Sequence, residues 1–470
     1  MAYDPSKQYR CDIVRSRSIK LSDDLIPAYA NIIDSLCPCN EAEFIDGFNN
    51  TLKAYLLKLG SSVDMKALNN HRTETAKTLF GMYYVDHLGK VQASERTKQY
   101  LLDRDQPAFF KDVCYKLQFP NGMSKPKTII ERVGDGLKLY PCRFLIAVMQ
   151  VADQKGLLLT KQEVGFYILN SQDVLIGKSS PNEVINRIIK DRKKGIVNKI
   201  PSGSFNWQHI TGIITYLEYA NLLIETKGRT QDQTILRLNN LETSAISIFV
   251  SNRNQKLAFN VAKYITKIGT VTKLKKEFQA DWDKYNSEVS SQYANFYTSP
   301  SSLGISVLKM PVKPTTSYTA AIGAAGEKYV FDYEVDRVSK INPSFGACVK
   351  NRANERRIGF DIESVSGVGM NPKAPIYIEV KTTSRVTEPS AVSSMDMVNL
   401  THYEWKAACD FPDQFYLYRV YLVKGKVLLY IIGKVYDKEY TSLIDVTATS
   451  YQVRFDVADT NVVDKKEQIV

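Results

Sequence analysis

The chain has 470 residues, enough for about three domains at roughly 150 residues each. Its hydrophobic content of 44% is ordinary for a protein that buries globular cores, and no stretch approaches the roughly 18 uncharged apolar residues of a membrane span. The net charge of +12 and the pI of about 9.1 favour a polyanionic partner, most simply nucleic acid.

The thiols and imidazoles of the chain argue against several kinds of metal chemistry. Seven cysteines without a repeated spacing indicate reduced thiols in a cytoplasm, and the N-terminal stretch lacks the apolar core of a secretion signal. Cys37 and Cys39 form a close pair, but no second Cys or His pair completes a zinc site. The four histidines are scattered, which argues against nucleases and hydrolases built on clustered imidazoles.

A first domain is expected over residues 1–140. Residues 22–37, 40–60 and 62–81 have apolar residues at helical spacing, and residues 82–94 are typical of two short strands around a Leu-Gly turn. Three helices followed by a hairpin is the order of a winged helix-turn-helix. In such a module the third helix enters the major groove of DNA, while the hairpin touches the backbone.

A second domain of the same kind, followed by a helical segment, is expected over residues 141–288. Residues 141–170 and 180–195 have helical patterns, and residues 206–239 run from a helix into a hairpin with a polar, Gly-containing tip. Helices beside a hairpin also occur in ordinary α+β domains. The basic charge of the chain favours the version that reads DNA.

Basic side chains concentrate where such units would meet a phosphate backbone. Charge runs are usually solvated faces, so no single run decides the function. The candidates for phosphate or base contacts lie in the third helix of the first unit, in the basic run 187–199 and in the second hairpin: Arg72, Lys77, Lys193, Lys194, Lys227 and Arg229.

A linker is expected over residues 289–317, because Ser, Pro and Thr are frequent there and helical periodicity lapses. The C-terminal domain, residues 318–470, is predicted as a mixed sheet flanked by helices. The predicted helices cover 317–340 and 399–411, and the predicted strands cover 357–367, 374–384, 414–423 and 426–435. The second of these helices opens with a capping box formed by Thr401 and Glu404.

Two of the predicted strands place acids and a lysine at alternating positions. In "FDIES", Asp361 and Glu363 are expected on one face, while Phe360 and Ile362 take the other. In "IYIEVKT", Glu379 and Lys381 share a face. If the two strands pair as a hairpin with like faces together, Asp361, Glu379 and Lys381 converge on one patch.

Such a patch has a chemical use. Two carboxylates, Asp361 and Glu379, can hold a hard divalent cation with water completing its shell, and the backbone carbonyl of Val380 is a candidate third ligand. The ammonium of Lys381 can then orient a water and stabilise charge on a phosphate. The alternative is an exposed pair between Glu379 and Lys381 at a sheet edge, a surface salt bridge worth about 0–1 kcal/mol.

The pattern Gly-Phe-Asp-Ile-Glu-Ser, a turn, then Ile-Glu-Val-Lys-Thr-Thr resembles the PD-(D/E)xK nuclease superfamily. It is especially similar to the domain at the C-terminus of the plant protein NO VEIN, which also occurs in bacterial DNA-defence proteins. The resemblance covers roughly residues 320–435. It implies Asp361 and Glu379 as metal ligands, Lys381 as the catalytic lysine and Glu327 as an accessory carboxylate. One departure is that a phenylalanine precedes the aspartate, where the namesake motif has proline.

The expected protein is multidomain, with α/β and α+β parts. Mostly helical, winged-helix-like DNA-reading domains precede a C-terminal PD-(D/E)xK mixed sheet flanked by helices. The expected function is Mg²⁺-dependent, sequence-specific hydrolysis of double-stranded DNA, as in type II restriction enzymes, in the cytoplasm of a bacterium or archaeon. One active site per chain predicts a homodimer at least on DNA. A cognate methyltransferase would be a separate chain, because no Gly-rich cofactor loop follows a strand.

Two alternatives stay open at the level of sequence. The enzyme could be modification-dependent, with a pocket for a methylated base, and aromatic residues at 11% of the chain are compatible with this. The chain could also be a DNA-binding regulator whose nuclease-like domain is not catalytic. The intact set of two acids and a lysine argues against the regulator, because buried carboxylates are costly to keep without a use.

Overall fold

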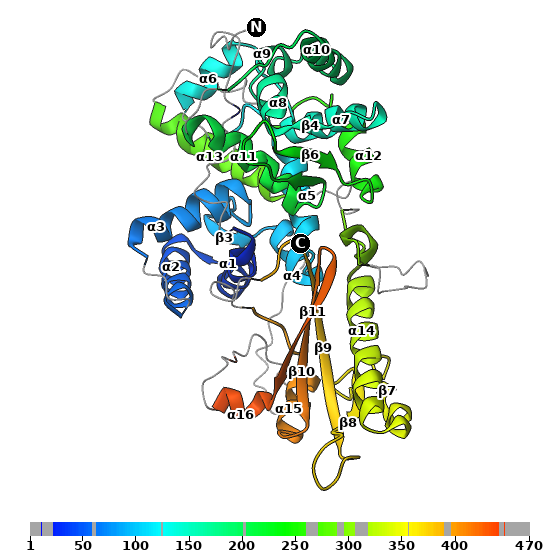
Figure 1. The fold of residues 1–470 in the computed structure, drawn as a ribbon. Helices are drawn as coiled ribbons and strands as arrows, with labels where there is room; N and C mark the ends of the chain where they lie inside the picture. The colour runs from blue at the N-terminus through cyan, green and yellow to red at the C-terminus, as the bar shows by residue number, and fades with distance from the viewer. Residues whose placement is uncertain are drawn as a thin grey trace, which may run out of the picture.

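The structure, a computed structural model, consists of a helical N-terminal part and a C-terminal domain built on a sheet (Figure 1). The buried core of the first part ends at Phe296, and the cores of the second begin at Leu303, so each part has its own core. No described helix is both long and apolar enough to cross a membrane. The structure describes residues 22–58, 63–123, 126–200, 204–259, 271–288, 296–305, 318–355, 357–389 and 396–440, and also Cys11 and Val446.

The N-terminal part begins with the predicted order of helices followed by a hairpin. An additional short strand, β1, pairs with β3 and gives a three-stranded sheet of order β1-β3-β2. The carboxylate of Asp86 closes the hairpin by accepting the backbone N–H groups of Leu88 and Lys90 at 2.9 Å each. The elements of this unit are α1 Ser22–Leu36, β1 Cys39–Asn40, α2 Glu41–Lys58, α3 Met65–Asn70, the π-helical η3 His71–Leu79, β2 Tyr83–Val85 and β3 Lys90–Ala93.

A second unit repeats this order of elements. Its strands form a sheet of order β4-β6-β5, so in both units the third strand lies between the first and the second. Capping boxes start α8 and α10, where Glu163 pairs with Thr160 and Glu183 with Ser180. The elements are α7 Pro141–Gln154, β4 Leu159–Thr160, α8 Lys161–Glu163, η4 Val164–Leu169, α9 Gln172–Leu175, α10 Pro181–Lys193, α11 Ser204–Tyr219, β5 Leu223–Thr226 and β6 Ile235–Leu238.

The remaining helices tie the two units together. The indole of Trp282 on α13 is buried and donates to the backbone oxygen of Thr78 at 2.9 Å, so α13 packs against the first unit although it follows the second in sequence. Both units therefore share one continuous core, across the expected boundary at residue 140. These helices are α4 Glu95–Asp103, α5 Gln106–Lys116, α6 Pro126–Gly134, α12 Thr243–Ser251 and α13 Val271–Ser287.

The C-terminal domain contains the predicted mixed sheet, which has five strands in the order β11-β10-β9-β8-β7. β9 runs parallel to β10, and the other pairs are antiparallel. The elements are α14 Tyr318–Ile341, η8 Pro343–Cys348, β7 Lys350–Asn351, β8 Ile362–Val365, β9 Pro375–Arg385, α15 His402–Asp410, β10 Phe415–Val423, β11 Lys426–Gly433 and α16 Val435–Tyr440.

Helices cover the sheet on its two faces. The long helix α14 lies along the sheet (Figure 1) and shares a core with Ile378 and Val380 of β9. A second core joins Ala408 of α15 to Phe415 of β10, and Tyr377 of β9 packs against it. Because side chains alternate along a strand, Glu379 and Lys381 lie on the same side of the sheet as Tyr377, which is the side of α15.

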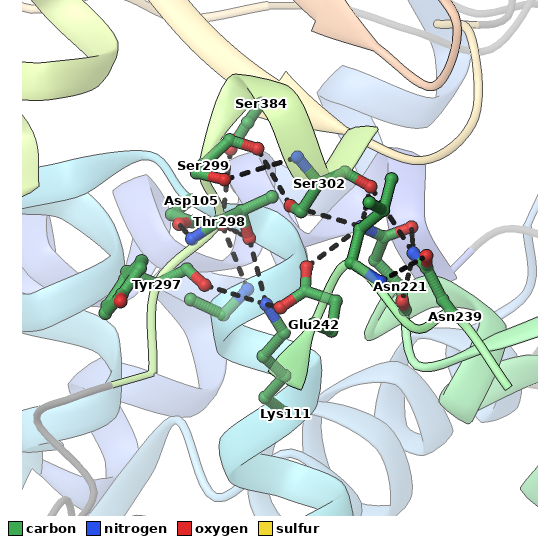
Figure 2. A network of polar contacts seen from close by, with 12 residues as sticks. Asp105, Lys111, Asn221, Asn239, Glu242, Tyr297, Thr298, Ser299, Ser302 and Ser384 are labelled. Atoms are coloured by element: carbon green, nitrogen blue, oxygen red, sulfur yellow. Dashed lines mark hydrogen bonds and ion pairs between the residues drawn. The ribbon is translucent and has the colours of Figure 1, made fainter. Parts of the chain in front are cut away.

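A buried polar junction joins the two parts of the molecule (Figure 2). Asp105, between α4 and α5, accepts hydrogen bonds from the backbone N–H of Thr298 at 2.6 Å and from the hydroxyl of Ser384, near the end of β9, at 3.2 Å. The hydroxyl of Thr383 donates to the backbone oxygen of Arg104 at 2.8 Å. The strand that carries Glu379 is therefore hydrogen-bonded directly to the N-terminal part.

An ion pair completes the same junction. Lys111, which is fully buried, lies 2.8 Å from Glu242 and donates to the backbone oxygen of Tyr297 at 2.8 Å. Residues 296–305, within the expected linker, are packed here, and they include the short 3-10 helix η7 Pro300–Leu303. Separating the two parts would remove the hydrogen bond that the buried carboxylate of Asp105 accepts from Ser384, and a buried charge that loses a partner is costly.

The contact between α14 and β9 requires glycine at position 326. A Cβ atom there would lie 1.9 Å from Oγ1 and 2.9 Å from Cβ of Thr382, so rotation of the threonine would not remove the clash. Gly323, one turn earlier, has only Glu327 nearby, at 3.8 Å. We expect Gly326→Ala to destabilise the protein by about 1–3 kcal/mol through overpacking.

Gly323→Ala is the matched control, and we expect it to stabilise the chain by up to about 1 kcal/mol because alanine favours helix. Chemical unfolding followed by circular dichroism measures both changes. Equal effects of the two substitutions would contradict the close approach of α14 and β9.

Candidate active site

Two adjacent strands position the predicted acids. β8 and β9 pair with Ile362 opposite Ile378, and the N–H of Asp361 donates to the oxygen of Ile378 at 2.9 Å. This register places Asp361 opposite Glu379. The carboxylate of Asp361 accepts the backbone N–H of Val380 at 2.8 Å, which fixes it beside β9. The structure thus brings the two acids together, as the alternation predicted.

Lys381 lies in the same cluster. Its ammonium is 2.7 Å from Glu379 and 2.8 Å from Glu404, which comes from the first turn of α15. Glu404 also forms the predicted capping box with Thr401, which is confirmed. Sequence reasoning treated Glu404 mainly as a helix cap and missed its contact with Lys381, because only the packing of α15 against the sheet brings the two together.

The cluster is largely closed to solvent. Glu379 is 3% exposed, and burial, followed by the charge of Asp361, raises its pKa to about 9. Burial also raises the pKa of Asp361. Burial alone would lower the pKa of Lys381, but the charges of Glu379 and Glu404 raise it above its ordinary value. The Lys381 side chain is therefore an ammonium ion near neutral pH.

Glu327, from α14, belongs to the electrostatic surroundings of the pair. Burial, followed by the charge of Asp361, raises its pKa to about 7, while the charge of Lys381 opposes both. The site thus gathers more acidic groups than one ammonium balances, and this donor set suits a hard divalent cation. Among the described residues, no three His, Cys, Asp or Glu side chains form a complete metal cage, so such a cation would also need backbone oxygens, water or substrate.

Phe360 and Ile362 do not share a face, contrary to prediction. β8 begins only at Ile362, which is buried in the core beneath α14. The ring of Phe360 packs at a tilt against Tyr377, with 4.6 Å between the ring centroids, on the side of α15. Phe360 precedes β8, so the alternation of side chains along a strand does not apply to it, and the prediction for its face was wrong for this reason.

Glu363 lies outside the cluster. Its carboxylate is 2.6 Å from Arg352 and 3.7 Å from Lys350, and both basic residues lie at the β7 edge. Glu363 is therefore a partly exposed structural acid two residues from Asp361, which makes it a suitable comparison for experiments on the site.

The basic residues selected from the sequence fall into two groups. Arg72 is 8% exposed and donates to Asn49 at 2.9 Å, so its burial argues against a contact with DNA. Lys77 lies 3.3 Å from Asp283 of α13 and is held in the fold by this pair. Four candidates remain exposed, two at the end of α10 and two in the β5–β6 hairpin: Lys193, Lys194, Lys227 and Arg229.

The fold and the site define a modular protein in which a helical part with two similar units is attached to a sheet domain with an acidic site. Two family models match it: "Restriction endonuclease BpuJI - N terminal" over residues 3–283 and "Protein NO VEIN, C-terminal" over residues 326–432. The first match covers more than half of the chain. The chain therefore belongs to the restriction endonuclease BpuJI N-terminal family.

A solved structure supports this assignment. It is the binding domain of the BpuJ1 endonuclease, crystallised in complex with pyrene- and phenanthrene-modified DNA. The two proteins are 41% identical, with a TM-score of 0.55, and the match covers 61% of this chain and all of that domain. No curated protein matches the chain.

The raised pKa of Glu379 predicts a pH effect on stability. A carboxyl whose pKa is about 9 in the folded state and about 4.5 in the unfolded state destabilises the fold as pH rises between these values. Glu379→Gln removes this loss. We expect its free energy of unfolding, relative to the parent chain in EDTA, to increase between pH 5 and pH 9 by at least about 1.4 kcal/mol, the equivalent of one pKa unit.

Glu363→Gln serves as the control, because that carboxylate is ion-paired at the edge of the sheet. We do not expect the free energy of unfolding of Glu363→Gln to increase relative to the parent chain between pH 5 and pH 9. If the free energies of unfolding of Glu379→Gln and of the parent chain changed in parallel with pH, burial would not raise the pKa of Glu379.

Proposed function

We propose that the protein is a Mg²⁺-dependent, site-specific DNA endonuclease of the type II restriction class. Its C-terminal domain would be the PD-(D/E)xK nuclease and its N-terminal part would read the sequence. The observation that carries the proposal is the cluster of Asp361, immediately before β8, with Glu379 and Lys381 of the paired strand β9. The other part of the chain belongs to a restriction endonuclease family.

In this proposal Asp361, Glu379 and the backbone carbonyl of Val380 hold the cation. When bound, Mg²⁺ lowers the pKa of the attacking water and neutralises the scissile phosphate. Lys381, whose ammonium lies between Glu379 and Glu404, offers this charge to the same phosphate. Glu327, whose pKa of about 7 lets it exchange a proton near neutrality, is the accessory carboxylate.

Double-stranded DNA is the proposed partner of the N-terminal part. A 41% identical binding domain was crystallised with DNA, and the repeated order of helices and hairpin supports two winged-helix-like readers. The exposed candidates for phosphate contacts are Lys193, Lys194, Lys227 and Arg229.

Cutting both strands of a duplex has consequences for the oligomeric state and the partners of the protein. One cluster per chain and two strands to cut imply a homodimer at least on DNA. A cognate methyltransferase, if the host DNA needs protection, is a separate chain. The proposed setting is the cytoplasm of a bacterium or archaeon.

Plasmid cleavage tests the catalytic assignment. We expect the wild-type chain with Mg²⁺ to produce defined fragments, and EDTA to stop the reaction. Asp361→Ala and Lys381→Met should each lower the cleavage rate by about a hundredfold or more, because each removes a group that acts on the developing charge. Glu363→Gln should cleave at nearly the wild-type rate.

The alternatives predict other results. Equal digestion by all variants would reject the site. Tight binding to one duplex without cleavage would indicate the non-catalytic regulator, and cleavage of methylated plasmid alone would indicate a modification-dependent enzyme. Run-off sequencing of the products gives the target and the cut position together.

A second experiment addresses DNA binding. Lys227 and Arg229 lie in the exposed β5–β6 hairpin. We expect the double change to alanine to weaken binding and to reduce the slope of log affinity against log salt by about 2, one for each lost phosphate contact.

Lys328→Ala is the control for this experiment, because Lys328 is an exposed lysine on α14 that pairs with Asp332 at 2.7 Å. An unchanged salt slope in the hairpin variant would remove this hairpin from the proposed interface.

A further inference from the structure

The turn between β8 and β9 presents apolar side chains to solvent. We call residues 366–374 the hairpin tip. Met370 is fully exposed, at 106% of its reference area, and Val368 is 68% exposed. Among the described residues, Met370 is the most exposed large apolar side chain. Single apolar residues are normal on a protein surface, but two strongly exposed ones in the same turn indicate a surface that contacts a partner.

The hairpin tip is a built structure. The N–H of Ser366 donates to the oxygen of Ala374, and the N–H of Gly367 to that of Pro372, each at 2.8 Å. Gly367 has a φ of +76°, which favours glycine, and a Cβ atom there would lie 2.5 Å from Ile341. The turn geometry thus depends on glycine and backbone hydrogen bonds, and it does not require Val368 or Met370.

The base of the tip is held from α14. The guanidinium of Arg337 donates to the backbone oxygens of Ser366 at 3.0 Å and Val365 at 2.7 Å. The same guanidinium pairs at 2.7 Å with Glu334, which is fully buried. These contacts hold the base of the tip in place, so the tip can press against a bound partner without moving away from it.

The charge around the tip suits a polyanion. Lys373 is exposed, and the tip contains no acid. The basic residues of the β7 edge, Lys350 and Arg352, are paired with Glu363 and Glu355 and add no net charge, so Lys373 supplies the charge of the tip. A polyanionic duplex, the molecule that the candidate active site on the same hairpin would hold, therefore suits this surface better than a basic or neutral protein surface does.

The tip lies at the end of the hairpin that carries the candidate active site. Asp361 precedes β8, and Glu379 lies four residues beyond Pro375, about 13 Å along β9 at roughly 3.3 Å per residue. With the turn included, Met370 is on the order of 20 Å from Glu379 along the hairpin. A duplex lying along it would pass the tip about six base pairs from the scissile phosphate, at roughly 3.4 Å per pair.

We propose that the hairpin tip is a wedge that inserts Met370 and Val368 into a groove of the bound duplex and unstacks a base step near the cut. The inference rests on the proposed function, since it takes DNA as the molecule held at this site. Apolar side chains that enter a groove in this way kink DNA, and the larger protein surface that a bent duplex touches offsets the cost of unstacking.

The test uses full-length chain with Lys381→Met, which keeps bound DNA uncut, and a 40-base-pair duplex selected for binding from a random pool. 2-Aminopurine replaces one base at a time along the duplex. We expect binding to raise its fluorescence about two- to fivefold at one or two neighbouring positions. Adding Val368→Ser and Met370→Ser should abolish this signal, and in the otherwise wild-type chain the same pair should slow plasmid cleavage about tenfold.

Tyr440→Ser is the matched control, because Tyr440 is 83% exposed on α16, which follows β11, three strands from β8 in the sheet. It should leave the signal intact, and unfolding curves should coincide for all variants because these side chains make no core contacts. Cleavage without a signal, or a signal that survives the double change, overturns the wedge alone. A signal without wild-type cleavage overturns the proposed catalysis alone.

Sedimentation of the same complexes distinguishes a contact between proteins. Loss of a second copy of the chain from the DNA complex in the double variant, with the fluorescence signal unchanged, would assign the hairpin tip to an interface between copies and overturn the wedge. If no duplex is selected from the pool, both the wedge and the proposed function fail.

Discussion

The close approach of Asp361 and Glu379 across the β8–β9 pair is the constraint on which the rest of the C-terminal domain depends. Two buried carboxylates repel each other, and the fold offsets this with the N–H of Val380 and the ammonium of Lys381. Glu404 from α15 holds the ammonium from the other side. Burying these acids remains unfavourable for stability, and clusters of buried acids with strongly shifted pKa values are candidates for functional sites.

The same strand links this site to the N-terminal part. β9 carries Glu379 and Lys381 near its middle and ends at the junction, where Ser384 meets Asp105 and Thr383 meets Arg104. Because the buried carboxylate of Asp105 has a specific hydrogen-bond partner across the junction, the junction favours one relative placement of the two parts. Under the proposed function, in which one part reads bases and the other cuts, this placement would set the distance from the recognised bases to the cut.

Much of the site could be predicted because its pattern is local. Alternation along β9 placed Glu379 and Lys381 on one side, and pairing of the two strands brought Asp361 to them. The capping box at Thr401 was visible for the same reason. Prediction failed at Phe360, where the strand has not yet begun. Arg72 looked like a surface charge in a helix, yet it is buried against Asn49, a residue 23 positions away.

The sequence by itself determined the order of the helices and hairpins, the strand faces that hold the acids, and the basic charge of the chain. These depend on the spacing of neighbouring residues. Only the tertiary structure decided that α13 returns to the first unit, that Glu404 reaches Lys381, and that Asp105 meets Ser384, a residue 279 positions later. Such contacts depend on how separate elements pack. The spacing of neighbouring residues does not indicate which distant residue will become a contact.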